Sequence, residues 1–292
     1  MADQIVRNRL STNDTYERIL LEAREEMDRS VRELLFSAVA GGLAISITFL
    51  LYASVTAATD GAPVVSAILY PLGFIYIIIG NYQLYTENTL PPVALIIDRI
   101  ASLPALLRMY GIVLTGNVIG AGVGGLVLIY GGVFDPASAA AATDIAMTGV
   151  ATDWWPLFFK GAFAGLIVAG VVWMDYSVRG AGARIALIYL AFLAIPVGGL
   201  FHVVVAATEV TFLVADGAIV LWAGIYGFAL PVLLGNTAGG ILLVTIVNYY
   251  QTCPGIHRFE GVLSYREWLS TMNTGAIPID RLRANLQQSD IE

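Results

Sequence analysis

The residues in this chain best suited to proton chemistry lie inside apolar stretches. His202 directly follows a break rich in proline and glycine, and Glu209 lies seven residues beyond it. Seven residues make two helical turns, so a helix through this region places both side chains on one face. Histidine changes its charge near neutral pH, and beside a permeating weak-acid anion it can donate a proton or a charged hydrogen bond and then recover it. A lone histidine is usually a satisfied core residue, but its place beside the break favours proton exchange with a small solute over a purely structural role.

Glu209 and Lys160 each allow two interpretations. Acidic residues inside membrane spans are costly and usually functional, but Glu209 can also pair with a neighbouring helix or be shielded in an oligomer interface. Lys160 is the only lysine of the chain and lies near the outer end of an apolar stretch. It can extend to the membrane interface or lend positive potential to an outer vestibule. The residues alone leave both questions open.

Two copies of one short motif are the best candidates for holding such a site. GNVIGAGVGG, which begins at Gly116, and GNTAGGILL, which begins at Gly235, share a GN-x-x-G pattern at an offset of 119 residues. Glycines four residues apart let helix backbones approach closely. Asn117 and Asn236 need partners, because an unsatisfied amide in hydrocarbon costs several kcal/mol. A broken helix nearby has free backbone groups, so we expect each asparagine to bind one break.

Two polar interruptions lie at matching positions, centred on Thr86 and His202 and offset by 116 residues. In the first, GNYQLYTENTLPP, we expect Gly80 and Asn81 to end one helix. Thr89 or Thr86 should cap the next helix, with both prolines in its first turn. Non-helical backbone at membrane depth is tolerated only inside protein or beside a water-filled cavity. The two breaks therefore predict a site near the membrane midplane.

Composition indicates a multi-spanning membrane protein. The chain is 58% hydrophobic and 13% charged, with a mean hydropathy of +0.76, whereas a soluble domain is about 45–50% apolar and about 25% charged. The single cysteine, Cys253, excludes a disulfide framework and a multi-cysteine metal site. A basic face for nucleic acid is absent, and no nucleophile–base pair, metal cluster or phosphate loop indicates an enzyme. The excess of 22 acidic residues over 15 basic ones, almost without lysine, suggests a halophilic source.

Six segments of the chain meet the roughly 20 apolar residues that a helix needs to cross the hydrocarbon core. Four are uninterrupted, and the second and fifth are longer and broken near their middles. In chain order the segments are 35–54, 64–98, 107–131, 156–174, 182–214 and 226–250. Arginines gather before the first span, in the second and fourth connections and in the tail, and the other connections have none. The positive-inside rule therefore places both ends of the chain in the cytoplasm.

Three spans separate the two copies of each motif, so the two halves of the chain must have opposite topology. This is the plan of an inverted 3+3 repeat, and it predicts an all-α membrane protein of six helices with the second and fifth broken. We expect a cytoplasmic amphipathic segment at 1–30, a channel domain at 31–252 and a cytoplasmic tail at 253–292. The first segment has apolar residues at helical spacing, which predicts an interfacial or packing helix, with a gate or sensor as the alternative.

Taken together, these motifs resemble the formate/nitrite transporter family. The likeness includes the broken spans, LYT at 84–86, FH at 201–202 and both GN-x-x-G motifs, and it covers about residues 30–252. It is strongest with an uncharacterised inner-membrane branch of that family. The resemblance implies an aquaporin-like fold, a homopentamer with one pore in each subunit, and a place in the cell membrane. It also implies a small monovalent anion such as formate or nitrite as the solute, often passed with a proton.

By matching motif positions, the resemblance implies roles for individual residues. His202 would face Thr86 across the pore, and Leu84 with Tyr85 would form a gate in the loop of the second span. The other hydrophobic constrictions would involve Phe74, Val168 and Ile195.

Three positions depart from the family pattern. Phe201 precedes the histidine, where transporting members often carry an acid, and Gly165 falls where some members carry an asparagine. Glu87 directly follows Thr86, and an ionised Glu87 would oppose an anion within a few ångströms by several kcal/mol. Its carboxyl group must be protonated, paired or turned away, or the solute is not a simple anion. A neutral-solute or water-type pore of the same fold and a non-transporting sensor or scaffold are therefore the alternatives.

Overall fold

The structure is a computed structural model that describes residues 10–252 and 260–283, and the elements formed by these residues are helices. Four stretches are long and apolar enough to cross a membrane: α2 (Val31–Ala58), α6 (Leu103–Tyr130), α8 (Trp154–Ser177) and Leu221–Thr252. They coincide within a few residues with the four uninterrupted spans predicted from the sequence, which are thereby confirmed. Cys253 lies outside the described residues.

The last of these stretches is not a uniform α-helix. Wider π-helical turns alternate with α-helical ones along it, in the order α11 (Leu221–Gly224), η2 (Ile225–Ala229), α12 (Leu230–Ala238), η3 (Gly239–Ile246) and α13 (Val247–Thr252). Pro231 contributes to this irregularity, because proline has no N–H group to donate to the preceding turn. Pi-helical turns are frequent at functional sites, and here they flank the α12 segment that carries the second GN motif.

Two regions between the long helices consist of shorter helices separated by irregular backbone. The first contains α3 (Pro63–Ser66), α4 (Leu72–Gly80), the 3-10 turn η1 (Glu87–Thr89) and α5 (Pro91–Ile97). The second contains α9 (Ala181–Val197) and α10 (Val203–Ala215). The irregular segments between α4 and η1, and between α9 and α10, lie at the two polar interruptions of the sequence.

The connection between α6 and α8 was treated in the sequence only as a link without arginine or lysine, and no helix was expected in it. It forms the helix α7 (Pro136–Val150), which begins with proline at its first position. The Asp135 side chain accepts hydrogen bonds from the backbone N–H groups of Ala137 and Ser138, both at 2.9 Å. An aspartate cap followed by proline and a run of alanines is a strong helix start, so the local sequence explains α7.

The long helices pack in pairs through small residues. α2 lies along α6, and α8 lies along α12. A side chain added at Gly116 of α6 would meet Ala38 and the Leu35 carbonyl of α2, while one added at Gly235 of α12 would meet the Phe158 carbonyl of α8. The GN motifs therefore bring helix backbones close together in both pairs.

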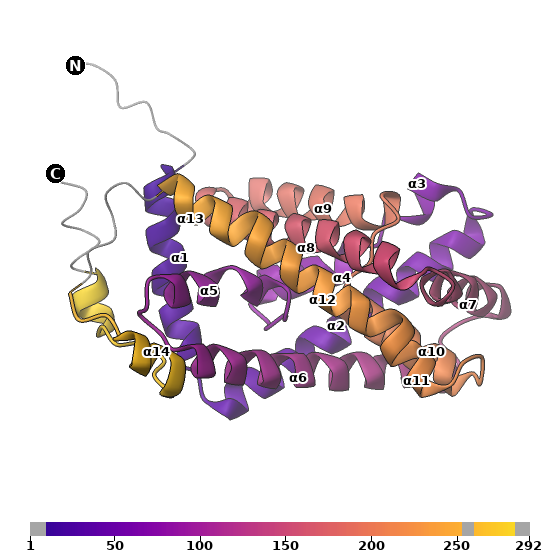
Figure 1. Cartoon of the computed structure of the whole chain (residues 1–292). Coiled ribbons are helices and arrows are strands. Elements are labelled where there is room, and N and C mark those ends of the chain that lie inside the picture. The colour runs from indigo at the N-terminus through magenta and orange to yellow at the C-terminus, as the bar shows by residue number, and fades with distance from the viewer. Residues whose placement is uncertain (1–9, 253–259, 284–292) are drawn as a thin grey trace, which may run out of the picture.

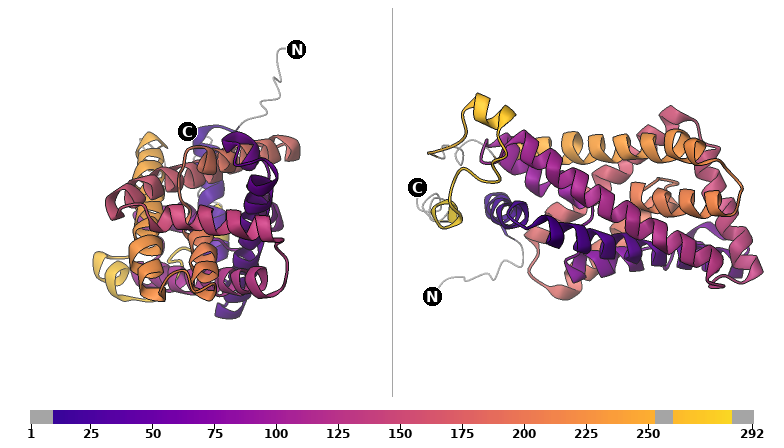
Figure 2. Two further views of the ribbon diagram at one scale, coloured as in Figure 1. Left: turned by 90° about the vertical axis from the view of Figure 1, so that its right-hand side faces the viewer. Right: turned by 90° about the horizontal axis from the view of Figure 1, so that it is seen from below.

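One end of the molecule is formed by α1 (Thr12–Met27) and α14 (Tyr265–Ser270), and α3, α7 and α11 lie at the opposite end (Figure 1). The view from below in Figure 2 shows the same separation along the long axis of the molecule. The segment around α14 is bound to the turn between α5 and α6: Leu263 N donates to Arg99 O at 2.9 Å, and Ala276 N donates to Ile100 O at 2.7 Å.

Candidate solute pathway

The two broken regions meet at Thr86 and His202. A hydrogen bond of 2.7 Å joins Thr86 Oγ1 to His202 Nε2. Both residues are buried, with exposed fractions of 0% and 1%. Thr86 immediately precedes η1, and His202 immediately precedes α10, so each side chain is presented by the irregular backbone of its own break.

Asn117 of α6 fixes the first break. Its Oδ1 atom accepts a hydrogen bond from Tyr85 N at 2.8 Å, and its Nδ2 atom donates to Gln83 O at 2.9 Å. The same Nδ2 group also donates to Ala38 O of α2 at 2.8 Å. The amide therefore satisfies backbone groups that the interruption of the helix leaves free, and it joins the break to α2.

Asn236 of α12 holds the second break with the same set of bonds. Its Oδ1 atom accepts from Val203 N at 2.9 Å, and its Nδ2 atom donates to Phe201 O at 3.0 Å and to Gly161 O of α8 at 2.8 Å. In both breaks the amide binds the N–H group of one residue and the carbonyl group two residues before it. We call these two arrangements the asparagine clamps.

The backbone ends at the first break differ in part from expectation. α4 ends at Gly80, followed by Asn81 in the left-handed conformation at φ 54°, as the sequence predicts. Thr89 or Thr86 was expected to cap the next helix, α5, and this is wrong for both. Leu90 stands at the cap position of α5 without a side-chain bond, and Thr86 precedes η1 without a side-chain cap bond. The Thr89 hydroxyl instead donates to Thr86 O at 2.7 Å, so it supports the loop before the helix.

Aromatic rings enclose the histidine on one side. The Phe74 ring meets His202 edge to face, with ring centroids 4.9 Å apart, and it stacks on Phe192 at 3.9 Å. Phe192 was not singled out from the sequence, because a phenylalanine in an apolar run has no contrast with its surroundings. Phe74, Leu84, Val168 and Ile195 are fully buried.

Tyr85 ties the first break to the far half of the chain. Its hydroxyl group lies 2.8 Å from Thr237 Oγ1 of α12, and its ring meets Tyr110 edge to face at 5.2 Å. The Tyr110 hydroxyl donates to Asn88 O at 3.0 Å. Thr237 and Tyr110 were missed in the sequence, although Thr237 directly follows the asparagine of the second clamp and so carried a usable signal.

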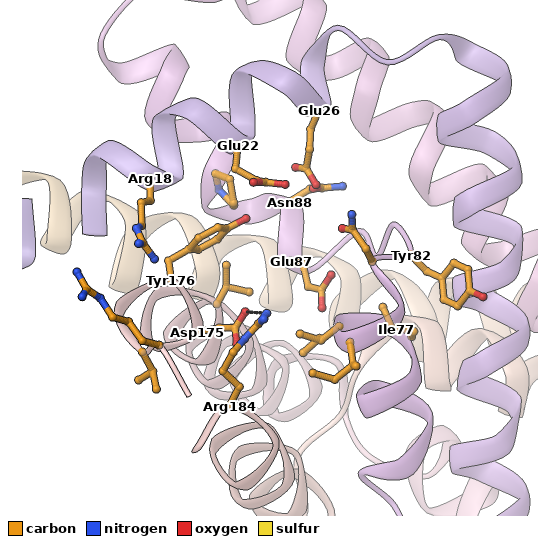
Figure 3. Close-up of a pocket in the computed structure, with 17 residues that line it drawn as sticks. Arg18, Glu22, Glu26, Ile77, Tyr82, Glu87, Asn88, Asp175, Tyr176 and Arg184 are labelled. Carbon is orange, nitrogen blue, oxygen red and sulfur yellow. Dashed lines mark hydrogen bonds and ion pairs between the residues drawn. The ribbon is translucent and has the colours of Figure 1, made fainter. Parts of the chain in front are cut away.

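A cavity of about 590 Å³ lies on the α1 side of the breaks. We call it the α1-side cavity, and its charged lining residues are Arg18, Glu22, Glu26, Glu87, Asp175, Arg179 and Arg184. Figure 3 shows that the carboxyl groups of Glu22 and Glu26, both on α1, and of Glu87 in η1 border one space. Arg184 is already paired, since its guanidinium group makes two hydrogen bonds to Asp175, at 2.5 and 2.6 Å.

Glu87 is the residue of this cavity that is nearest in sequence to the Thr86–His202 bond. Its Oε1 atom is enclosed and has no hydrogen-bond partner among the described residues. Glu26 is different, because its carboxylate accepts from Gln83 Nε2 at 3.0 Å, and Gln83 in turn accepts from Asn88 Nδ2 at 3.0 Å. Burial raises the pKa of Glu26 above its ordinary value of 4.5, and the bond from Gln83 opposes this effect.

A smaller cavity of about 160 Å³ lies on the other side of the bond, toward α7. We call it the α7-side cavity, and its titratable lining residues are Tyr52, Tyr70, Lys160, His202 and Glu209. The Lys160 ammonium group lies 5.4 Å from the centre of the Phe201 ring, within the range of a cation–π contact. The cavity therefore brings Lys160, His202 and Glu209 together, although they come from two different helices and a break.

The two cavities approach each other at the bonded pair. His202 lines the α7-side cavity, and Glu87, the neighbour of Thr86, lines the α1-side cavity. The buried residues Phe74, Leu84, Val168 and Ile195 line neither cavity. The Thr86–His202 bond is therefore a buried polar contact with residues of a cavity on each side of it.

A comparison with known protein families agrees with this geometry. The family model described as formate/nitrite transporter matches residues 13–250. The chain belongs to the formate/nitrite transporter family. It is therefore a member of a family of channels and transporters, with several helices that cross a membrane.

Two known bacterial proteins are similar in sequence to this chain. The inner membrane protein YfdC of Escherichia coli (strain K12) is 30% identical over 241 residues, which are 81% of this chain and 77% of that protein. The formate channel FocA of Haemophilus influenzae (strain ATCC 51907 / DSM 11121 / KW20 / Rd) is 25% identical over 251 residues, covering 74% of this chain and 85% of FocA.

Solved structures of formate/nitrite transporters share the fold. An FNT family ion channel aligns with a TM-score of 0.73 at 22% identity, covering 82% of this chain and 99% of that one. A pentameric formate channel with formate bound aligns with a TM-score of 0.65 at 19% identity, covering 76% of this chain and 97% of that channel.

Proposed function

We propose that this protein is a channel or proton-coupled carrier for a small monovalent anion of the formate or nitrite type. The observation that carries the proposal is the Thr86–His202 hydrogen bond, which joins two broken helices between two cavities. The kinship with a formate channel supports the solute class. His202 acts as the hydrogen-bonding or proton-donating centre and Thr86 as its partner, while Phe74, Leu84, Tyr85, Val168 and Ile195 restrict the passage.

The proposal includes an inverted 3+3 repeat of six membrane-crossing passes with an aquaporin-like arrangement. Two observations support it: the four long apolar helices, and the two asparagine clamps, whose bonds correspond one to one. In this scheme 1–30 and 253–292 are cytoplasmic ends of a channel domain at 31–252. The pentameric state of a related formate channel supports a homopentamer in the inner membrane, with one pathway in each protomer.

A second candidate is a pore of the same fold for a neutral solute. Glu87 is the residue that raises it, because its carboxyl group has an enclosed, unpartnered oxygen beside the pathway and in its ionised form would repel an anion. Current across a planar bilayer and the pH dependence of uptake together separate the two candidates. A formate gradient that drives current indicates anion flux. Solute movement without current indicates an anion that moves together with a proton where uptake follows an inward acid gradient, and a neutral permeant where it does not.

The main test is formate or nitrite uptake by proteoliposomes that contain the purified protein. Uptake should increase with an inward acid gradient and should fall in His202→Ala, with the elution volume in gel filtration as the control for folding. Flux of the same size and pH dependence in His202→Ala would contradict the proposed mechanism.

A further inference from the structure

Glu209 occupies an unusual position for an acidic residue of a membrane helix. It is only 5% exposed, yet it lines the α7-side cavity. No hydrogen bond or ion pair joins its carboxyl group to another of the residues that the structure describes. Burial of a carboxyl group without a partner favours its neutral form. A neutral carboxyl group that lines a cavity can donate its proton to a solute there.

His202 lines the same cavity and has one ring nitrogen without a partner among the described residues. Its Nε2 atom is occupied by Thr86, but its Nδ1 atom is enclosed and has no hydrogen-bond partner among the described residues. Nδ1 can accept a hydrogen bond or donate one, according to which ring nitrogen carries the proton. A small acid in the cavity would give this nitrogen the partner that the protein does not provide.

The two groups cannot reach each other directly. His202 directly precedes α10 and Glu209 lies seven residues further on, which is about 10 Å at the helical rise of 1.5 Å per residue. Both residues line the α7-side cavity, whose volume is about 160 Å³. It has room for a formate-sized solute together with water, so a proton can pass between the two residues only through what the cavity holds.

Among the titratable groups that line the cavity, Glu209 is the one best suited to donate a proton near neutral pH. Tyr52 and Tyr70 are phenols that give up protons only in alkaline solution. The Lys160 side chain is held above the Phe201 ring. From α7 the cavity receives Ile145 and Thr148, which are uncharged.

We propose that Glu209 is the proton-exchanging group of the α7-side cavity and that it acts on a weak-acid anion bound beside His202. This inference rests on the proposed function. The O–H bond of the Glu209 carboxyl group breaks, its proton passes along water in the cavity, and a new O–H bond forms on the anion, which becomes a neutral acid. Glu209 is left as a carboxylate and recovers a proton from the solution on that side, while His202 Nδ1 binds the neutral acid. In the opposite direction each step reverses.

The first test compares formate flux across proteoliposomes for Glu209→Gln, Glu209→Asp and the control Asp216→Asn. Asp216 is the exposed residue that ends the same helix and lies outside the cavity. Glu209→Gln should lower flux by roughly 10²-fold, the low end of what a positioned proton donor contributes, and should flatten its pH dependence. Glu209→Asp should restore most of the flux and the pH dependence, and Asp216→Asn should match the wild type.

Glu209→Gln with the flux and pH profile of Asp216→Asn would overturn the inference and leave the proposed function intact. A second measurement does not require transport: infrared difference spectra of the reconstituted protein between acidic and alkaline buffer. A carboxyl C=O band should be present in the wild type, absent from Glu209→Gln, and shifted by added formate and by His202→Gln. Identical spectra for the wild type and Glu209→Gln would refute proton exchange at Glu209, even if the wild type moved no formate.

Discussion

Thr86 Oγ1 lies 2.7 Å from His202 Nε2, although 116 residues separate the two in the sequence. The bond is the direct link between the two breaks, and each partner is held by its own clamp: Asn117 binds the backbone of Tyr85, and Asn236 binds the backbone of Val203. The position of the histidine therefore depends on both halves of the chain, and changes in either half should alter transport.

Removing the hydroxyl group of Thr86 should reproduce the loss of His202. Thr86→Val keeps the volume of the side chain but cannot bond Nε2, so formate flux should fall about as far as in His202→Ala. Thr86→Ser retains the hydroxyl group and should stay near the wild type. Because the two residues act as a unit, the double variant Thr86→Val/His202→Ala should be no slower than His202→Ala alone. Additive losses in proteoliposome uptake would show that the residues act independently.

Substitution of two glycines of α8 by alanine should have opposite effects on the stability of the protein. A β-carbon at Gly165 would overlap the backbone of Asn236, whereas one at Gly170 would meet nothing within 4 Å. Gly165→Ala should destabilise the protein by about 1–3 kcal/mol, because neither backbone can move aside without disturbing the second clamp. Gly170→Ala should be neutral or more stable by up to about 1 kcal/mol, since alanine favours the helix. The melting temperatures in detergent decide this, and equal values for both variants would contradict the packing of α8 on α12.

The clamps should be costly to remove, and to a similar extent in both halves. Asn117→Leu leaves the Tyr85 N–H group and the Gln83 carbonyl group buried without their amide partner, at about 1–3 kcal/mol for each group. Asn236→Leu does the same to Val203 and Phe201. Both variants should melt well below the wild type. Ser46→Ala is the control, because its exposed hydroxyl group bonds only within its own helix, to Leu43, and a drop of equal size there would contradict the prediction.

Stability should depend on pH through Glu26. Burial raises the pKa of this carboxyl group in the folded protein above its ordinary value of 4.5, so the folded state binds more protons than the unfolded state. The contribution of Glu26 to the free energy of unfolding is therefore fully present in acid and is lost as the pH rises from 4.5 through the raised pKa. Glu26→Gln stays neutral and can still accept the bond from Gln83. The variant should match the wild type near pH 4 and melt at a higher temperature near pH 8.

Glu25→Gln provides the comparison for this measurement. Glu25 is exposed and lies 3.9 Å from Arg283, an exposed ion pair of little energetic weight. Its substitution should leave the difference between pH 4 and pH 8 as it is in the wild type. If Glu26→Gln behaves in the same way, the buried carboxyl group is not the source of the pH dependence.

The sequence revealed those parts of the fold and site that differ chemically from their surroundings. Asn117, Asn236 and His202 are polar residues in apolar runs, and each must find a partner away from water, so they drew attention without any structure. Phe192 could not be found in this way, because its role comes from stacking on Phe74 and not from its residue type. The wrong prediction of a helix cap at Thr89 has a similar origin, since the Thr89 hydroxyl group donates its hydrogen bond to the Thr86 carbonyl group.

The helix α7 was missed for another reason. Its segment was assessed for length and positive charge as a connection between spans, and it is too short to cross a membrane. The cap at Asp135 and the alanine run after Pro136 are local signals that hydropathy does not weigh. The two cavities were equally out of reach, because they are formed by side chains from α1, α7 and α8 whose mutual positions only the packing defines.

The clamps also set an order of events during synthesis. Tyr85 binds Asn117, 32 residues later in the chain, and Val203 binds Asn236, 33 residues later. Each break is therefore synthesised before the asparagine that fixes it. Tyr85 can bond Thr237 only after a further 152 residues have been synthesised. The pathway is thus among the last features of the protein to take shape. We expect a chain that stops before Asn236 to insert its first helices and yet to contain no passage.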